Sequence, residues 1–127
     1  PVYISREIKG ADGKTEALEI DEDFDRAWRR VGVGLDRVGL NIEDRDRSAG
    51  IYYIRYLDPD YEVKKRNDEG LFSRWFSKEK PVDAPLYRVK LVSDGNKTTV
   101  TAMPDSDKTD PLSTSARILN LLQEQVR

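Results

Sequence analysis

The sequence predicts an α+β domain in which a mostly antiparallel sheet of about five strands packs against two helices. Five segments are rich in β-branched, aromatic or alternating apolar residues, and two others carry apolar residues at helical spacing. Short turn signals join four of the predicted strands into two hairpins. Hairpins that alternate with single helices are typical of an antiparallel sheet covered by helices on one face.

The composition limits the functions open to this chain. It has 127 residues, 37% hydrophobic and 36% charged, and a formal net charge of −2. The length fits one domain, and the acidic balance disfavours a nonspecific nucleic-acid binder. Cysteine and histidine are absent, which excludes a thiolate nucleophile and the usual general base near neutral pH. No apolar run reaches the roughly 18 residues of a membrane span.

We expect residues 1–14 to be a lead-in and residues 15–127 to be a single domain. The lead-in is either a linker or edge segment beside an upstream domain, or a frayed end. The chain begins with Pro1 rather than Met, so we expect it to be part of a longer protein. Residues 15–20 are then predicted to form the first strand, with Leu18 and Ile20 on one face.

A long helix follows, with Asp21 predicted as its N-cap and Gly39 as the residue that ends it. Gly32 and Gly34 each weaken a helix by about 1 kcal/mol relative to alanine. Their presence therefore predicts close packing against another element. The apolar stripe of this helix consists of Phe24, Trp28, Val31, Leu35 and Val38.

The remaining strands form two predicted hairpins on either side of a long connection. Residues 40–43 and 51–57 make the first hairpin, and residues 86–92 and 97–103 make the second. The connection over residues 58–85 is longer than compact domains usually carry without a purpose. A final helix is predicted to begin with Asp110 as N-cap and Pro111 as its first residue. Its stripe is Leu112, Ala116, Leu119, Leu122 and Val126.

No pattern for catalysis, metal binding or a cofactor stands out. The acidic run 105–110 lacks the glycine and the final glutamate of a calcium loop. The acids Glu43, Asp44 and Asp46 alternate with arginines, which favours cross-strand ion pairs over a catalytic carboxylate pair. Aromatic and basic residues around residues 52–56 suggest base stacking, but aromatic residues in strands more often pack in the core. We therefore expect no enzyme activity, no cofactor and no nucleic-acid partner.

The long connection contains the most unusual feature of the sequence, an aromatic cluster made of Leu71, Phe72, Trp75 and Phe76. On a short helical turn these side chains would share one face. An exposed cluster of this kind marks a contact with a partner or a membrane surface. Alternatively, the cluster folds down and covers the sheet or a gap beside the first helix. We predict these four residues as partner-binding.

Three runs carry a resemblance to a known family. Residues 24–31 (FDRAWRRV), residues 35–39 (LDRVG) and the turn 43–50 (EDRDRSAG) before a tyrosine-rich strand resemble the BamC (NlpB) outer-membrane lipoprotein family. The resemblance is to its C-terminal domain and covers the chain from about Leu18 onward. The segment 70–76 (GLFSRWF) is similar to an insertion in many members of that family.

This resemblance implies a helix-grip fold, an antiparallel sheet wrapped around a long helix. It also implies a noncatalytic scaffold domain that supports the β-barrel assembly machinery (the BAM complex), which inserts outer-membrane proteins in Gram-negative bacteria. The implied partners are other components of that machinery. The implied location is the outer membrane, through a lipidated N-terminal cysteine outside this chain. A rival hypothesis is a helix-grip domain that binds a small apolar ligand in the cleft between helix and sheet.

Overall fold

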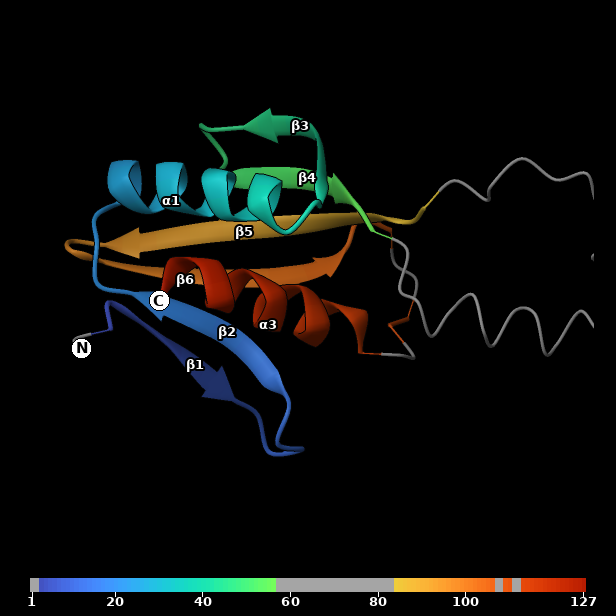
Figure 1. Cartoon of the computed structure of the whole chain (residues 1–127), viewed down its shortest axis with the longest axis horizontal. Helices are drawn as coiled ribbons and strands as arrows, with labels where there is room; N and C mark the ends of the chain where they lie inside the picture. Colours follow the sequence, from blue (N-terminus) through green and yellow to red (C-terminus); the bar gives the residue numbers. More distant parts are fainter. Residues whose placement is uncertain (1–2, 57–83, 107–108, 111–112) are drawn as a thin grey trace, which may run out of the picture.

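The computed structural model describes residues 3–56, 84–106, 109–110 and 113–127. In this part of the chain two helices lie on one face of a six-stranded sheet (Figure 1). Every neighbouring pair of strands is antiparallel, and the strand order is β1-β2-β6-β5-β4-β3. The elements are β1 (Ser5–Lys9), β2 (Thr15–Ile20), α1 (Phe24–Arg37), β3 (Asn41–Asp46), β4 (Ile51–Arg55), β5 (Leu86–Asp94), β6 (Lys97–Pro104) and α3 (Thr114–Val126).

The predicted α+β class is confirmed, but the sheet has six strands where the sequence predicted about five. The additional strand is β1, which lies in the predicted lead-in and pairs with β2 at the edge of the sheet. The edge-segment alternative therefore describes residues 5–9. The division of the chain at residue 14 stays a prediction, and nearly all of the predicted 58–85 connection lies outside the described residues.

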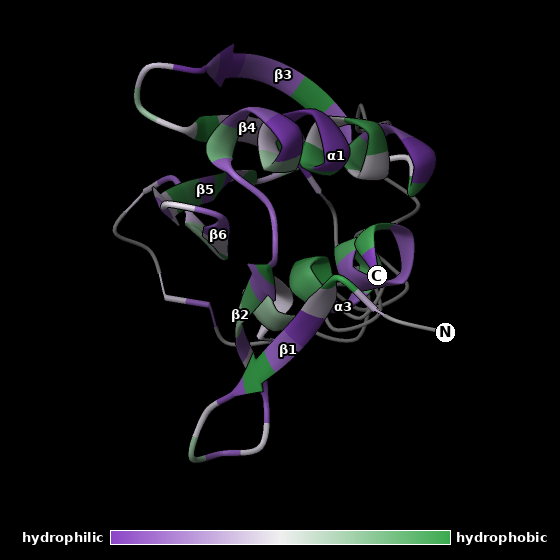
Figure 2. Cartoon of the chain, turned by 90° about the vertical axis from the view of Figure 1, so that its left-hand side faces the viewer, coloured by the Kyte–Doolittle hydropathy of each residue, from purple (hydrophilic) through white to green (hydrophobic). Residues whose placement is uncertain are grey.

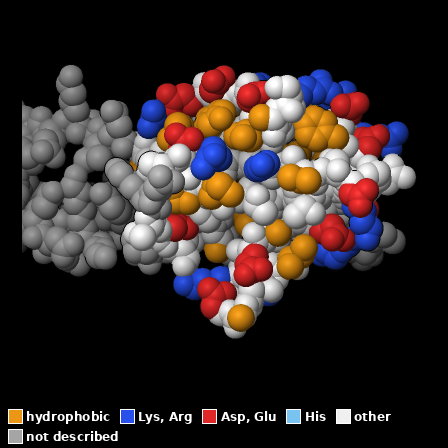
Figure 3. Space-filling view, turned by 180° about the vertical axis from the view of Figure 1, so that it is seen from behind, with side chains coloured by type: hydrophobic (Ala, Val, Ile, Leu, Met, Phe, Trp, Pro, Cys, Tyr) orange, Lys and Arg blue, Asp and Glu red, His pale blue; other side chains and the backbone are white. Residues whose placement is uncertain are grey.

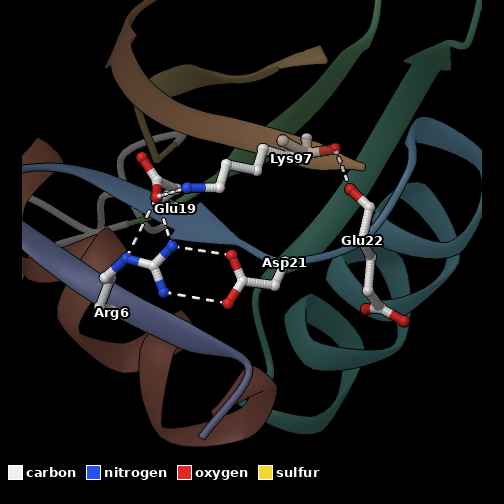
Figure 4. A network of polar contacts seen from close by, with 6 residues as sticks. Arg6, Glu19, Asp21, Glu22 and Lys97 are labelled. Atoms are coloured by element: carbon white, nitrogen blue, oxygen red, sulfur yellow. Dashed lines mark hydrogen bonds and ion pairs between the residues drawn. The ribbon is translucent and has the colours of Figure 1, made fainter. Parts of the chain in front are cut away.

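An ion-pair network attaches β1 to the sheet. The Arg6 guanidinium donates to Asp21 Oδ1 at 2.7 Å and to Glu19 Oε1 at 3.1 Å, and Lys97 of β6 approaches the same Glu19 oxygen at 3.4 Å. Figure 4 shows the Arg6 side chain lying between the two carboxylates. These hydrogen bonds hold the pKa values of both Glu19 and Asp21 below their usual range. The Asp21 carboxylate thus accepts hydrogen bonds from Arg6 of β1.

For that reason the predicted N-cap of α1 was wrong by two residues. The N-cap is Asp23, whose carboxylate accepts a hydrogen bond from the Arg26 backbone N–H at 3.0 Å. A cap side chain must reach the amides of the first turn, and Asp21 is turned toward Arg6 instead. The predicted end is confirmed, since Gly39 lies just beyond the helix with a left-handed φ of 75°.

The stripe of α1 packs onto the sheet as predicted. Trp28 stacks on Tyr52 of β4 with ring centroids 3.9 Å apart, and Phe24 stacks on Trp28 at 5.6 Å. The Tyr52 hydroxyl donates to the Trp28 backbone carbonyl at 2.6 Å. Figure 2 shows both helices beside the sheet, with hydrophobic and hydrophilic residues alternating along their turns. The largest fully buried side chains are Tyr52, Leu18, Ile20, Leu35, Ile54, Ile118, Leu119, Leu122, Val31, Val89, Val100 and Val126.

Both glycines in α1 lie at close contacts, which confirms the prediction made from their presence. A Cβ added to Gly32 would lie 2.6 Å from the Tyr52 hydroxyl oxygen. A Cβ added to Gly34 would lie 2.9 Å from a methyl group of Leu122 in α3. The missing side chain at Gly32 therefore leaves space for the Tyr52 hydroxyl against the helix backbone. The missing side chain at Gly34 lets α1 and α3 approach each other.

The second helix begins later than predicted. Its N-cap is Ser113, in a left-handed conformation and without a side-chain cap hydrogen bond. Asp110 nevertheless caps the helix from outside, because its carboxylate accepts the backbone N–H groups of Thr114 at 3.0 Å and Ser115 at 2.9 Å. The prediction placed the right side chain at this end of the helix, but the helix begins at Thr114, and the predicted first residue, Pro111, lies outside the described residues.

Candidate functional site: an arginine-lined groove on the first helix

The four residues predicted as partner-binding, Leu71, Phe72, Trp75 and Phe76, lie outside the described residues. The prediction about them therefore stays a prediction. The acidic run 105–110 is described in part. Its Asp105 Oδ1 lies 3.5 Å from Arg88 Nε, and its Asp110 caps α3. Among the described residues, no group of three or more acidic side chains is arranged to hold a metal ion.

The cleft between α1 and the sheet, the second candidate, is filled by side chains. Trp28 and Tyr52 stack directly across it, and Val31 and Leu35 of α1 are fully buried beneath the helix. At these described residues, close packing of this kind leaves no room for the small apolar ligand of the rival hypothesis.

The described residues form a groove on the outer side of α1. It has a volume of about 490 Å³ and lies between α1 and the C-terminal part of α3. Its lining residues are Glu22, Arg26, Arg29, Arg30, Val33, Gly34, Arg37 and Gln125. Four arginines and one carboxylate thus line this groove, in a chain whose formal net charge is −2.

The arginines of the groove differ in their partners. Arg30 forms an ion pair with Glu22, including a hydrogen bond from Nη2 to Glu22 Oε2 at 3.1 Å. This contact holds the pKa of Arg30 above its usual range. In the described part of the chain, the guanidinium groups of Arg26, Arg29 and Arg37 make no ion pair. These three exposed cations are available to an anionic partner.

An apolar side chain lies among these cations. Val33 is 45% exposed although it belongs to a packed helix. It lies one helical turn from both Arg29 and Arg30, and one turn from Arg37 on the other side. The groove therefore offers a small apolar contact flanked by guanidinium groups.

Sequence reasoning missed this groove because it followed the apolar stripe. The signal was present on the opposite side of the helix, where residues 26, 29, 30, 33 and 37 recur at helical spacing. The part that the sequence did not show is the wall from α3. Gln125 lies next to α1 only because Gly34 permits close helix packing.

One of the three acids in the charged hairpin forms the expected cross-strand ion pair. Glu43 pairs with Arg55 on the neighbouring strand, with one hydrogen bond of 3.2 Å. Asp46 accepts hydrogen bonds from the Ser48 hydroxyl at 2.7 Å and the Ala49 backbone N–H at 3.1 Å, which lower its pKa. These acids therefore hold local structure together.

Of the tyrosines considered for base stacking, Tyr52, Tyr53 and Tyr56, the first belongs to the buried core. Tyr52 is 1% exposed, and its burial raises its pKa to about 12 while Arg45 and Arg47 act in the opposite direction. The outer face of the sheet, seen from behind in Figure 3, carries charged side chains interleaved with hydrophobic ones. Val92 and Met103 are the large hydrophobic residues exposed on β5 and β6.

Together the fold and the groove define a class of protein, a small α+β domain with a packed interior and an exposed cationic surface. Among the described residues, no helix has the length and apolar character needed to cross a membrane. Residues 7–126 match the family described as outer membrane protein assembly factor BamC-like C-terminal domain. The chain belongs to this family.

Curated relatives agree with that assignment. The chain is 40% identical over 130 aligned residues to "Outer membrane protein assembly factor BamC" of Accumulibacter regalis, covering 100% of this chain and 33% of the relative. It is 41% identical over 126 residues to the protein of the same name from Thiobacillus denitrificans, covering 97% and 34%. The protein of that name from Ferrimonas balearica is 26% identical over 130 residues, covering 98% and 33%. The chain thus spans about a third of the relatives it matches.

Proposed function

We propose that this chain is a noncatalytic protein-interaction domain of a BamC-like lipoprotein, and that it acts with other components of the β-barrel assembly machinery at the outer membrane. The observation that carries this proposal is the family match over residues 7–126. Attachment through an N-terminal lipid, outside this chain, belongs to the same proposal.

The physical character of the described residues supports a binding role without catalysis. The pKa shifts of their carboxyl groups are all downward, at Glu19, Asp21 and Asp46, and each comes mainly from hydrogen bonds to neighbouring side chains. A general acid near neutral pH needs a carboxyl pKa raised toward 7. The ion pairs with Arg6 and the turn hydrogen bonds of Asp46 account for these shifts, which favours a structural role for these acids.

Two surfaces are proposed to contact partners. One is the arginine-lined groove. The other is the aromatic cluster of the long connection, Leu71, Phe72, Trp75 and Phe76, for which the sequence is the support. Aromatic residues and arginine are both enriched in protein–protein interfaces, where they supply most of the binding energy.

Site-specific photo-crosslinking in cells tests the proposal. A photoreactive amino acid is placed at Phe72, Trp75 or Val33 of the full-length protein that contains this chain, with Asn96 in the exposed β5–β6 turn as a control. We expect discrete crosslinks to a component of the assembly machinery from at least one of the three positions and none from Asn96. A folded, expressed protein without any such crosslink would overturn the proposed function.

A further inference from the structure

We infer that the arginine-lined groove binds an extended, acidic segment of a partner protein, with an apolar side chain of that segment resting on Val33 between flanking carboxylates. This inference rests on the proposed function, since it names the chemistry of the partner in such an interaction domain.

Charge complementarity is the first argument. Three of the four groove arginines, Arg26, Arg29 and Arg37, carry guanidinium groups without an ion pair in the described part of the chain. The planar guanidinium presents paired N–H donors that match the two oxygens of a carboxylate. Two carboxylates close in sequence to Arg26 are engaged elsewhere, because Asp23 caps α1 and Asp25 pairs with Arg47 at 2.5 Å.

The dimensions of the groove favour a short extended peptide. Arg26 and Arg37 lie eleven residues apart on α1, which corresponds to about 16 Å along the helix axis. A peptide in extended conformation covers that distance with about five residues. Acidic residues at the two ends of such a segment would therefore reach Arg26 and Arg37, and a central side chain would reach Val33.

The shape of the site favours a peptide over an anionic membrane surface. A flat bilayer meets cations that project from a convex or flat face, whereas these line a concavity bounded by Gln125 of α3. Glu22 also contributes a carboxylate to the groove, and its ion pair with Arg30 leaves the other three arginines as the net charge of the groove. The same carboxylate and the Gln125 amide provide hydrogen-bonding groups for the backbone of a peptide.

The test measures binding of a fluorescein-labelled peptide in which pairs of glutamates flank a central leucine. The full-length protein that contains this chain is used in detergent at 50 mM NaCl, and fluorescence anisotropy is the readout. The control peptide has glutamine in place of every glutamate. The groove variant combines Arg26→Gln, Arg29→Gln and Arg37→Gln, leaving the Arg30–Glu22 pair intact. The matched control variant removes the same charge elsewhere, by Arg45→Gln, Lys90→Gln and Lys97→Gln.

We expect the acidic peptide to bind and the glutamine peptide not to bind. Each exposed arginine–carboxylate pair contributes about threefold to affinity, so the groove variant should bind roughly thirtyfold more weakly. The matched control variant should change affinity by less than about threefold, since its charges lie outside the groove. Val33→Glu, a second variant that keeps every arginine, should also abolish binding by placing a negative charge at the centre.

Three results would overturn the inference. They are equal binding by the groove variant and the unaltered protein, equal losses in the two triple variants, and binding of vesicles containing phosphatidylglycerol through these arginines without any peptide binding. Crosslinks from Phe72, Trp75 or Val33 to the assembly machinery that persist in the groove variant would leave the proposed function standing while this inference fails. If the protein without groove substitutions gives no crosslinks from these positions, the proposed function itself is overturned.

Discussion

Replacing Gly32 by alanine would press a methyl group against the Tyr52 hydroxyl, and the cost should depend on that hydroxyl. The added Cβ would lie 2.6 Å from Tyr52 Oη, well inside the 3.4–4 Å of ordinary contact. Tyr52 has little freedom to retreat, since its ring stacks on Trp28 at 3.9 Å and its hydroxyl donates to the Trp28 carbonyl at 2.6 Å.

The magnitude follows from three opposing contributions. Overpacking a buried site costs about 1–3 kcal/mol, and displacing the Tyr52 hydrogen bond costs about 1 kcal/mol more. Alanine in place of glycine raises the stability of the helix by about 1 kcal/mol, because its helix propensity is higher. We therefore expect Gly32→Ala to lower the free energy of unfolding by about 2 kcal/mol.

Removing the hydroxyl should remove most of that cost. With Tyr52→Phe as background, the nearest ring atom to the new Cβ is Cζ at 3.2 Å, which requires a shift of only a few tenths of an ångström. Gly32→Ala should then change stability by less than about 0.5 kcal/mol, giving a coupling energy of about 1.5–2 kcal/mol. Urea denaturation followed by far-UV circular dichroism measures all four corners of this cycle.

The other helix glycine provides the matched control. A Cβ on Gly34 would meet Leu122 of α3 at 2.9 Å and has no Tyr52 atom among its nearest contacts. The cost of Gly34→Ala should therefore be the same with and without Tyr52→Phe. Equal costs of Gly32→Ala in the two backgrounds would refute the proposed contact between the helix and the tyrosine.

Three further predictions follow from polar contacts. Asp110→Ala should lower the free energy of unfolding by about 1 kcal/mol in urea denaturation, since two backbone N–H groups at the start of α3 lose their acceptor. Thr98→Val should lower the free energy of unfolding by about 1–2 kcal/mol, because the buried Thr98 hydroxyl donates to the Glu22 backbone carbonyl at 2.9 Å. Arg6→Gln should destabilise the protein at pH 7 but much less at pH 2.5. The pKa values of Glu19 and Asp21 are lowered in the folded state, so their stabilisation is present above the ordinary values of 4.5 and 3.8 and is lost as pH falls through the folded values.

Each of these predictions has a control and a contrary outcome. For Asp110→Ala the control is Ser106→Ala, an exposed position outside the cap, and equal effects of the two changes would contradict a capping role. For Thr98→Val, a loss no larger than that of Thr101→Val on the same strand would show that the hydroxyl is unimportant. For Arg6→Gln, a stability difference that stays constant between pH 7 and pH 2.5 would rule out the carboxylate pairs as its source.

The elements that depend on local periodicity could be predicted, and the contacts between distant segments could not. The spacing of Phe24, Trp28 and Val31 placed α1, and Gly39 placed its end. Asp21 and Asp23 are both good N-caps by residue type. The choice between them depended on Arg6, which comes from a strand that the sequence analysis left out of the sheet.

The candidate site was beyond sequence reasoning for a related reason. Arginine at helical spacing on a polar face is by itself typical of a solvated helix surface. Gln125 turns that face into one wall of a groove, and it lies about ninety residues further along the chain. The aromatic cluster of the connection, by contrast, was conspicuous in sequence and lies outside the described residues.

The sequence by itself determined the α+β class, seven of the eight described elements and the likeness to the BamC family, because periodicity, turn residues and motif runs are local properties. The tertiary structure decided which elements lie side by side. It placed β1 at the sheet edge, Tyr52 over Gly32, and α3 against Gly34 to form the groove. Such contacts are set by packing among residues far apart in the chain, where volume and charge must match in three dimensions.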